Sequence, residues 1–272
     1  MSAKTTNTDK DLVVGLGKTG LSIARYLERN DADAIFFDSR DEPPGLAELE
    51  ALFPDAQVRL GGDALPRGVT RIIASPGVAD SHPLMKKALK KKVEIISDIE
   101  LFARDAAQPF VAVTGSNGKS TVTTLLYHMC RAAGQKVLAG GNLGEPALDL
   151  LGEDAPDIYV LELSSFQLQR TRQLPAEVAV LLNVSPDHLD WHASEEEYRE
   201  AKYRVFDQAA AAVVNRSDDT AAQRAERCGR VVTFGLDAPD ADQFGIREDE
   251  GEKYLACGDV LLLSVRDLGL YG

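Results

Sequence analysis

The segment Val113–Thr121 has the sequence VTGSNGKST, a phosphate-binding pattern with two residues fewer than usual. The usual spacing, G-x-x-x-x-G-K-[ST], places four residues between its glycines, whereas only Ser116 and Asn117 separate Gly115 from Gly118. The segment follows an apolar stretch, FVAVTG, and precedes a long amphipathic one, KSTVTTLLYHMCRAAG. This order predicts a strand, a loop and a helix, and such a unit directs backbone N–H groups and the helix dipole at an anion. The segment therefore predicts an α/β fold with a phosphate site.

Lys119 and the hydroxyl residues after it give this loop its expected chemistry. Lys119 would meet the β- and γ-phosphates of a nucleotide, and Ser120 or Thr121 would offer a hydroxyl to Mg²⁺. A glycine-containing turn with a solvated lysine is the alternative interpretation. We interpret the shorter spacing as a modified loop rather than a failed one.

The part of the chain before this loop alternates between patterns typical of strands and patterns typical of helices. Apolar runs that end in glycine, proline or aspartate alternate with stretches whose apolar residues have helical spacing. This alternation predicts a parallel sheet. The predicted strands are 12–17, 34–38, 71–77 and 93–97, and the predicted helices are 19–30 and 82–92.

The small, polar segment 103–110, ARDAAQPF, is typical of a short linker, and the strand–loop–helix order restarts directly after it. We place a domain boundary near residue 107. We therefore expect a Rossmann-like parallel-sheet domain over residues 1–107 and a P-loop-type α/β domain with a small antiparallel β tail over residues 108–272. The later predicted elements are strands at 110–115, 136–140, 157–165, 177–185, 211–215 and 230–235, a helix from about 194 to 206, and antiparallel hairpins over 244–272.

Composition argues against several classes of function. The chain carries 43 acidic and 30 basic residues, for a formal net charge of −13, and it has no stripe of Lys and Arg with interleaved aromatics, so we expect no nucleic-acid partner. Cys130, Cys228 and Cys257 form no CxxC pair, which favours reduced thiols over a zinc site or a disulfide framework. The N-terminus has no apolar signal region, and no apolar run approaches the roughly 18 residues of a membrane helix. We expect a cytoplasmic protein that binds no membrane.

A second glycine-rich loop, Gly15–Gly20 (GLGKTG), fits the pattern G-x-G-x-x-G and lies between a predicted strand and a predicted helix. Such glycines let the backbone approach a diphosphate at a helix N-terminus, and Asp38, at the end of the next strand, would reach a ribose. Three interpretations stay open: a nucleotide diphosphate, a dinucleotide redox cofactor such as NAD, or a tight structural turn. The phosphate-binding segment at 113–121 counts against NAD.

Acidic and imidazole side chains follow two later strands. Glu162 lies within the apolar run YVLELSSF, where a carboxylate is costly unless it is paired or bound to a metal. Asp187 and His188 lie in NVSPDHLDWH, at the end of another apolar strand, where ligands collect in open α/β sheets. Taken singly, Glu162 is also explained by an ion pair and His188 by a structural hydrogen bond. Together with a phosphate loop, they indicate a magnesium site.

Five segments, taken in order along the chain, resemble the Mur ligases, which are ATP-dependent amide-forming ligases. They are VTGSNGKST (113–121), GGNLG (140–144), LELSSFQL (161–168), NVSPDHLD (183–190) and YREAKYRVF (198–206). Within the family, ELSSFQL together with GLGKTG and ASPG most resembles the members that add D-glutamate to UDP-N-acetylmuramoyl-L-alanine. The resemblance implies that ATP phosphorylates the terminal carboxylate of that substrate, and that the amine of D-glutamate then attacks the acyl phosphate.

The resemblance also implies roles for residues at matching positions. Lys119 would polarise the γ-phosphate, and two Mg²⁺ ions would be held by Ser120, Glu162, His188 and a carbamylated Lys202. Without the family, Lys202 is interpreted as an ordinary lysine on a helix surface. The implied ATP-binding residues are Thr114, Gly115, Ser116, Asn117, Gly118, Lys119, Ser120 and Thr121. The implied contacts to the UDP-substrate are Gly17, Lys18, Thr19, Ser39, Arg40, Gly77, Asn142, Ser164 and His188, so that the first glycine loop would bind UDP rather than NAD.

Mur ligases carry a third, C-terminal domain that contacts the amino-acid substrate, and this sequence ends at about the point where that domain would begin. We expect the 272-residue chain to be a two-domain fragment that binds the UDP-substrate but shows little or no ligase activity by itself. Two other functions stay open. One is a related ligase, such as a different Mur ligase or a folylpolyglutamate synthetase-like enzyme, and the other is a module that only binds a UDP-sugar.

Overall fold

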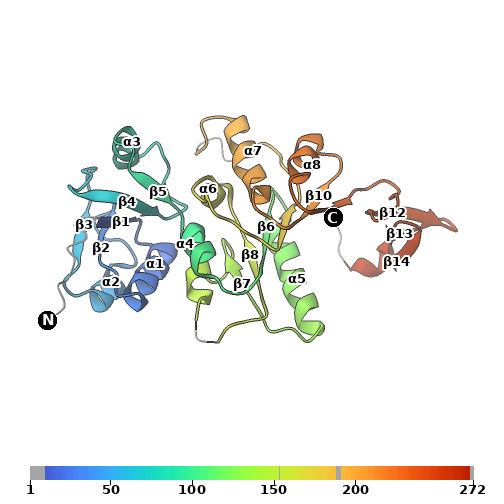
Figure 1. Ribbon diagram of the computed structural model, residues 1–272, viewed down its shortest axis with the longest axis horizontal. Helices are drawn as coiled ribbons and strands as arrows, with labels where there is room; N and C mark the ends of the chain where they lie inside the picture. The colour runs from blue at the N-terminus through green and yellow to red at the C-terminus, as the bar shows by residue number, and fades with distance from the viewer. Residues whose placement is uncertain (1–9, 153, 188–190, 270–272) are drawn as a thin grey trace.

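Residues 10–96 form a parallel five-stranded sheet whose strands lie in the order β3-β2-β1-β4-β5 (Figure 1). The computed structural model describes residues 10–152, 154–187 and 191–269. Short apolar runs in the central strands are buried on both faces, as is typical of a parallel sheet covered by helices. The strands are β1 (Lys10–Val14), β2 (Ala34–Asp38), β3 (Gln57–Leu60), β4 (Val69–Ala74) and β5 (Glu94–Ile96).

Helices cover both faces of this sheet because successive strand residues point to opposite sides. Val13 and Phe36 pack with the apolar face of α1 on one side. Leu12 and Ile35 pack with α3 on the other side. The helices are α1 (Lys18–Arg29), α2 (Leu46–Leu52), α3 (Pro83–Lys90) and α4 (Asp98–Asp105).

The chain begins this sheet at its centre. From β1 it runs outward through β2 and β3, and it then returns to the other side of β1 with β4 and β5. The loops after β1 and β4 therefore leave the carboxyl end of the sheet in opposite directions, and such a switch point is where ligands bind in open parallel sheets. This strand order confirms the Rossmann-like fold expected for the first part of the chain.

A second sheet contains nine strands in the order β14-β13-β12-β11-β10-β9-β6-β8-β7 (Figure 1). The strands from β6 to β12 pair in parallel, whereas β12, β13 and β14 form antiparallel hairpins, which confirms the predicted architecture. The strands are β6 (Phe110–Thr114), β7 (Val137–Gly141), β8 (Ile158–Glu162), β9 (Val178–Leu181), β10 (Ala211–Asn215), β11 (Arg230–Phe234), β12 (Phe244–Asp249), β13 (Glu252–Cys257) and β14 (Val260–Ser264). The helices are α5 (Lys119–Ala132), α6 (Ser165–Gln169), α7 (Glu195–Tyr203) and α8 (Asp219–Ala225), with 3-10 turns η1 (Ala147–Leu150), η2 (Arg204–Phe206) and η3 (Val265–Leu268).

The connection between the sheets is shorter than the linker predicted at 103–110. Helix α4 continues to Asp105 and β6 begins at Phe110, so that residues 106–109 alone connect them. The helix persists because Phe102 packs edge-on against Phe110, with ring centroids 5.7 Å apart. The division of the chain into domains at residue 107 stays a prediction.

Three smaller outcomes concern other sequence predictions. The prediction lacks α2 and β3, which are only seven and four residues long and largely exposed, and it also lacks α4, α6 and α8. The predicted helix from about 194 to 206 consists of α7 followed by the 3-10 turn η2. Every helix in the described part of the chain falls short of the length and hydrophobicity that crossing a membrane requires.

Helix α1 also joins the two sheets. Its Arg25 pairs with Asp149 of η1 at 2.5 Å, and its Arg29 donates to the carbonyl of Leu148 at 2.9 Å. Beneath these contacts, apolar residues of both sheets belong to one continuous core. The carboxyl ends of the two sheets are therefore held in a defined relation to each other.

The turn between β1 and α1 depends on close backbone approach at Gly20. A Cβ atom at this position would lie 1.8 Å from the carbonyl oxygen of Gly15, whereas a Cβ at Gly17 would meet nothing within 4 Å. We expect Gly20→Ala to lower the free energy of unfolding by about 3 kcal/mol through this clash. Gly17→Ala, the matched control, should cost less than about 1 kcal/mol. Urea unfolding of both variants tests this, and equal midpoints would contradict it.

Candidate functional site

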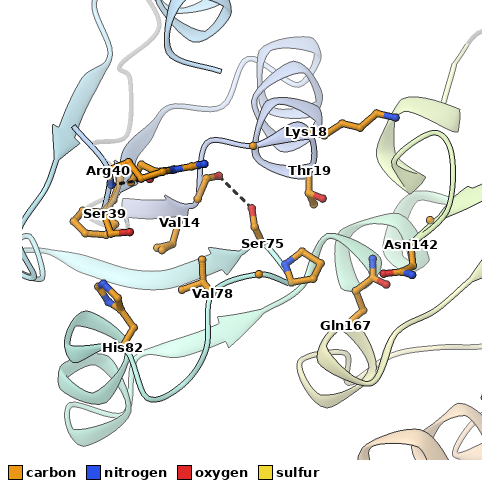
Figure 2. A pocket seen from close by; sticks show the side chains of 17 residues that line it. Val14, Lys18, Thr19, Ser39, Arg40, Ser75, Val78, His82, Asn142 and Gln167 are labelled. Atoms are coloured by element: carbon orange, nitrogen blue, oxygen red, sulfur yellow. Dashed lines mark hydrogen bonds and ion pairs between the residues drawn. The ribbon is translucent and has the colours of Figure 1, made fainter. Parts of the chain in front are cut away.

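A cavity of about 480 Å³ opens at the switch point of the first sheet and extends to the second sheet (Figure 2). Seven of the nine residues predicted to contact the UDP-substrate line it: Gly17, Lys18, Thr19, Ser39, Arg40, Gly77 and Asn142. Ser164 is not among the lining residues, and His188 lies outside the described residues. The other lining residues include Gly15 and Asp38, which the sequence analysis had considered for a nucleotide diphosphate or a dinucleotide. The sequence prediction lacks the remaining ones, which are Val14, Phe37, Ser75, Pro76, Val78, His82, Gly141 and Gln167.

The two ends of the cavity come from different sheets. Figure 2 shows Ser39, Arg40 and His82 at one end, on elements of the first sheet, and Asn142 and Gln167 at the other end. These residues are far apart in the sequence, and only the packing of the two sheets brings them to one cavity. The two ends of the cavity can therefore contact different parts of an extended ligand.

Asp38 holds the glycine loop through a hydrogen bond to its backbone. Its buried carboxylate accepts hydrogen bonds from the Leu16 amide at 2.7 Å and from the Arg40 amide and guanidinium at 2.7 to 2.9 Å. Burial alone would raise the pKa of Asp38, but the hydrogen bonds from Arg40 and Leu16 lower it to about 2. Asp38 therefore stays ionised and orients Arg40, a role different from the ribose contact considered for a dinucleotide site.

Positive charge lies at the cavity in the side chains of Lys18 and Arg40. The Lys18 ammonium donates to the carbonyl of Gly144 at 2.6 Å, across to the second sheet. Thr19 points toward the cavity from the first turn of α1 (Figure 2). Two cations beside a glycine loop and a helix N-terminus suit a diphosphate.

The phosphate loop predicted at 113–121 joins β6 to α5 and is shaped by the loop after β9. Gly118 adopts the left-handed conformation, with φ of 82°, at the N-cap of α5. Asn183 holds the turn on both sides, because its Oδ1 accepts from the Asn117 amide at 2.9 Å and its Nδ2 donates to the Asn117 carbonyl at 3.1 Å. The compact loop is thus supported by the loop after β9 rather than by additional residues of its own.

The side chains of the loop contact the surrounding protein or the loop itself. The hydroxyls of Thr114 and Ser116 bond within the protein, to the Leu163 carbonyl at 2.8 Å and to the Tyr198 hydroxyl at 2.7 Å. The Lys119 ammonium lies over its own loop and donates to the carbonyls of Gly115 and Ser116 at 2.9 and 3.0 Å. A lysine in this position can exchange loop carbonyls for phosphate oxygens.

Glu162 joins the cavity to the phosphate loop. Its side chain, 2% exposed, ends β8, and its two carboxylate oxygens accept from Ser120 Oγ and from Asn142 Nδ2, both at 2.7 Å. A carboxylate next to a hydroxyl supplies the hard oxygen donors that Mg²⁺ prefers, and Mg²⁺ often takes its remaining ligands from water and phosphate. No group of three or more His, Cys, Asp and Glu suited to a metal occurs among the described residues. The donor set therefore fits an ion that a nucleotide completes.

Lys202 is buried, which corrects its interpretation as a surface lysine. It is 2% exposed, its ammonium donates to the Gly115 carbonyl at 2.8 Å, and it lies 4.9 Å from the centre of the Tyr198 ring. Burial, together with the charge of Lys119, lowers the pKa of Lys202 to about 7, although Asp187 and Glu162 act in the opposite direction. The helix pattern alone missed this, because the phosphate loop that covers Lys202 belongs to another part of the chain.

Gln167 connects the cavity to a buried acid of the first sheet's last helix. Its Nε2 donates to both oxygens of Asp98 at 3.2 Å, and its Oε1 accepts from the amide and hydroxyl of Ser164 at 3.1 Å. Ser164 in turn caps α6 by accepting from the Gln167 amide at 3.2 Å. The S-x-x-Q capping pattern at 164–167 is a sequence signal that could have located this helix start.

Two family models match most of the chain. The model described as the Mur ligase middle domain matches residues 113–264, and that described as Mur ligase MurD-like, N-terminal domain, matches residues 9–97. A UDP-N-acetylmuramoylalanine--D-glutamate ligase of Nitrosococcus oceani is 46% identical over 96% of this chain and 58% of its own length. The protein of that name from Legionella pneumophila strain Paris is 46% identical over 96% of this chain and 60% of its own length. The chain thus spans 58 to 60% of these curated relatives.

Solved structures of distant relatives share the fold. A UDP-N-acetylmuramate:L-alanyl-gamma-D-glutamyl-meso-diaminopimelate ligase from Neisseria meningitides superposes with a TM-score of 0.57 at 15% identity, covering 91% of this chain and 84% of that one. A UDP-N-acetylmuramate-alanine ligase from Thermotoga maritima gives 0.52 at 19% identity, covering 94% and 59%. At these identities the likeness concerns the fold alone.

The buried acid Asp98 should make stability depend on pH. Burial raises its pKa to about 6, although hydrogen bonds from Gln167 and the local backbone oppose this. The folded-state value lies above the unfolded value of about 4, so the folded protein holds the extra proton, and stability falls as pH rises from about 4 to about 6. The loss is on the order of 3 kcal/mol.

Urea unfolding of the wild type and of Asp98→Asn between pH 4 and pH 7 checks this expectation. The wild type should lose stability relative to Asp98→Asn as pH rises, whereas Asp105→Asn, on the same helix but exposed, should keep the wild-type slope. Parallel pH profiles for the wild type and Asp98→Asn would contradict the assignment of the buried proton to Asp98.

Proposed function

This chain belongs to the Mur ligase family, and we propose that it contributes to an ATP-dependent amide ligase that joins D-glutamate to UDP-N-acetylmuramoyl-L-alanine. The relatives at 46% identity carry the name of that activity. In this proposal, residues up to about 107 bind the UDP part of the substrate, and residues from about 108 bind ATP. Because ATP is the phosphoryl donor, the proposal implies the cytoplasm as the compartment.

One observation carries the proposal: Asn142 lines the nucleotide cavity and donates to Glu162, which binds Ser120 of the phosphate loop. The far end of the cavity is therefore adjacent to the loop proposed to hold ATP. A substrate whose UDP end lies at Ser39 and Arg40 would extend toward Asn142 and bring its distal carboxylate toward the phosphates. This arrangement supports a ligase over a module that only binds a UDP-sugar.

The chemistry requires two anions to react. A carboxylate oxygen of the substrate forms a bond to the γ-phosphorus, the bond from that phosphorus to the β,γ-bridging oxygen breaks, and ADP leaves. The amine of D-glutamate then attacks the acyl carbon, the C–N bond forms, and phosphate and a proton depart. Bound Mg²⁺, with two ions proposed, supplies positive charge that reduces the repulsion between carboxylate and triphosphate.

The residues of this chain would divide the work. Lys119 would move from the loop carbonyls to the γ-phosphate oxygens and stabilise the charge that develops there. Glu162 and Ser120 would hold the magnesium ion nearest the triphosphate. The amides at the start of α5 would hold the other phosphate oxygens. His188 is proposed as a further ligand on family grounds alone.

Lys202 is proposed to react with CO₂. Carbamylation needs the neutral amine, whose nitrogen attacks the carbon of CO₂ and then loses a proton, and a pKa of about 7 makes that form available at neutral pH. The product is an anion near Lys119, so the repulsion between the buried Lys202 and the partly buried Lys119 becomes an attraction. Its oxygens are the kind of ligand that a second Mg²⁺ would take.

The carbamate can be detected directly. With ¹³C-labelled CO₂ at about pH 8, the wild type should give a protein-bound carbamate carbon signal in NMR spectra, and the signal should vanish on acidification. Lys202→Arg should lack the signal, whereas Lys136→Arg, which changes an exposed lysine just before β7, should retain it. A wild-type spectrum without the signal would refute the carbamate.

Ligand binding tests the function. Calorimetry should show that UDP-N-acetylmuramoyl-L-alanine and Mg-ATP both bind, and Lys119→Ala should weaken Mg-ATP binding about tenfold or more through the lost charge-assisted contacts. The same variant should leave the UDP-substrate affinity within about twofold. Lys136→Ala, the exposed control, should change neither affinity. Binding of NAD in place of the UDP-substrate would overturn the proposal.

Two alternatives are separated by an amino-acid panel. The panel uses a three-domain version of the ligase, because this chain by itself is expected to show little or no activity. Phosphate release that depends on D-glutamate supports the proposed ligase, whereas release that depends on L-alanine or on a folate substrate indicates another member of the superfamily. Binding of the UDP-substrate with no Mg-ATP binding would leave the UDP-sugar-binding module. The cavity contacts favour a UDP-type substrate over a folate.

A further inference from the structure

Arg170 is a buried cation that the proposed reaction does not use. It follows the last turn of α6, its side chain is 4% exposed, and it is not among the residues that line the nucleotide cavity. Its guanidinium extends from the end of α6 to the loop after β4. There it donates to the Val78 carbonyl and to Asp80 Oδ1, both at 2.6 Å, and to the Ser75 carbonyl at 3.4 Å.

The loop that Arg170 contacts forms one wall of the cavity. Residues 75–78, which include Gly77, line it directly (Figure 2). The first sheet holds the start of this loop, because the Ser75 amide donates to the Val14 carbonyl at 2.9 Å and the Ser75 hydroxyl donates to the Gly15 carbonyl at 3.1 Å. The contacts at Val78 and Asp80 are therefore further along the loop, where it turns away from the sheet.

Because Arg170 is buried, its guanidinium needs its hydrogen-bond partners to stay in place. Desolvation lowers the pKa of Arg170 from its ordinary value, and Asp80 opposes that shift. A buried guanidinium is tolerated only when charge and hydrogen-bond acceptors remain in place. Movement of the loop away from Arg170 would leave the cation without Asp80 and the Val78 carbonyl, so the loop conformations that break the contact are disfavoured.

The side chain of Arg170 is itself held in position. Its guanidinium carbon lies 5.2 Å from the ring centre of Trp191, and Trp191 packs on Phe166 with ring centroids 4.4 Å apart. The planar guanidinium is thus fixed between an aromatic face and the loop that it binds. Because Trp191 holds the guanidinium in place, the N–H groups of Arg170 can fix the position of the loop that they contact.

We propose that Arg170 is a positioning residue for the nucleotide cavity, which holds the Ser75–Asp80 wall in the conformation that accepts a uridine diphosphate group. The inference rests on the proposed function for the identity of that group. A residue of the proposed ATP-binding part thereby sets the affinity of a site built mainly on the first sheet.

The chain offers a matched control for this role. Arg172 also forms an ion pair between the two parts of the chain, from its Nη1 to Glu94 Oε1 at 2.9 Å, but its side chain is 60% exposed and does not contact the cavity wall. Calorimetry with UDP as the probe should show Arg170→Met weakening binding about tenfold or more, and Arg172→Met changing it less than about twofold. Asp80→Asn and Arg170→Lys should weaken binding in the same direction by a smaller factor.

A second ligand separates positioning from general support of the fold. Mg-ADP, which is expected at the phosphate loop, should bind Arg170→Met within about twofold of the wild type. In the protein without UDP, hydrogen exchange of the amides in 75–80 should accelerate in Arg170→Met and not in Arg172→Met. If Arg170→Met does not fold, the same measurements are made with Arg170→Lys and Asp80→Asn.

Three results would overturn the inference. They are UDP affinity unchanged in Arg170→Met, an equal loss of UDP and Mg-ADP affinity, and unchanged hydrogen exchange in 75–80. A wild-type chain that does not bind UDP would count against the proposed function instead, and the exchange measurement would still decide whether Arg170 holds the wall.

Discussion

The buried carboxylate of Glu162 is the constraint on which both candidate sites depend. It ends β8 inside the protein, where an ionised group is costly without partners, and it is stabilised there by Ser120 on one side and Asn142 on the other. One of these partners lies in the first turn of α5, and the other lines the cavity at the switch point of the first sheet. Loss of either partner would therefore disturb both sites, because a single charge is shared between them.

The packing of the two sheets places the partners of Glu162 beside a cavity that both parts of the chain line. Helix α1 binds η1, a continuous apolar core lies between the sheets, and α6 sends Gln167 and Arg170 toward the first sheet. The cavity is consequently built by both parts of the chain. Its ligand would bridge them, so the affinity of one part depends on residues that the other part supplies.

Much of the fold could be predicted from short-range patterns. The apolar runs, the two glycine loops and the restart of the strand–loop–helix order indicated both sheets and the antiparallel tail. The short elements α2, β3, α4, α6 and α8 were missed, and the linker was drawn too long because Phe102 keeps α4 intact by packing on Phe110. For the candidate site, the loop residues were identified by spacing, whereas no local signal indicates that Gln167 meets Asp98 or that Arg170 meets Val78 and Asp80.

The sequence by itself determined the local geometry of this protein: where strands end, where glycines allow a tight turn, and which residues stand at the start of α5. These features depend on neighbours within a few positions. Only the tertiary structure decided the chemistry that depends on burial. Lys202 becomes a buried amine with a lowered pKa because Gly115, 87 positions earlier, covers it, and Glu162 meets Ser120 and Asn142 across 42 and 20 positions. Desolvation and charge pairing act through space, so an apolar run can indicate that Glu162 needs a partner but cannot indicate which distant residues supply it.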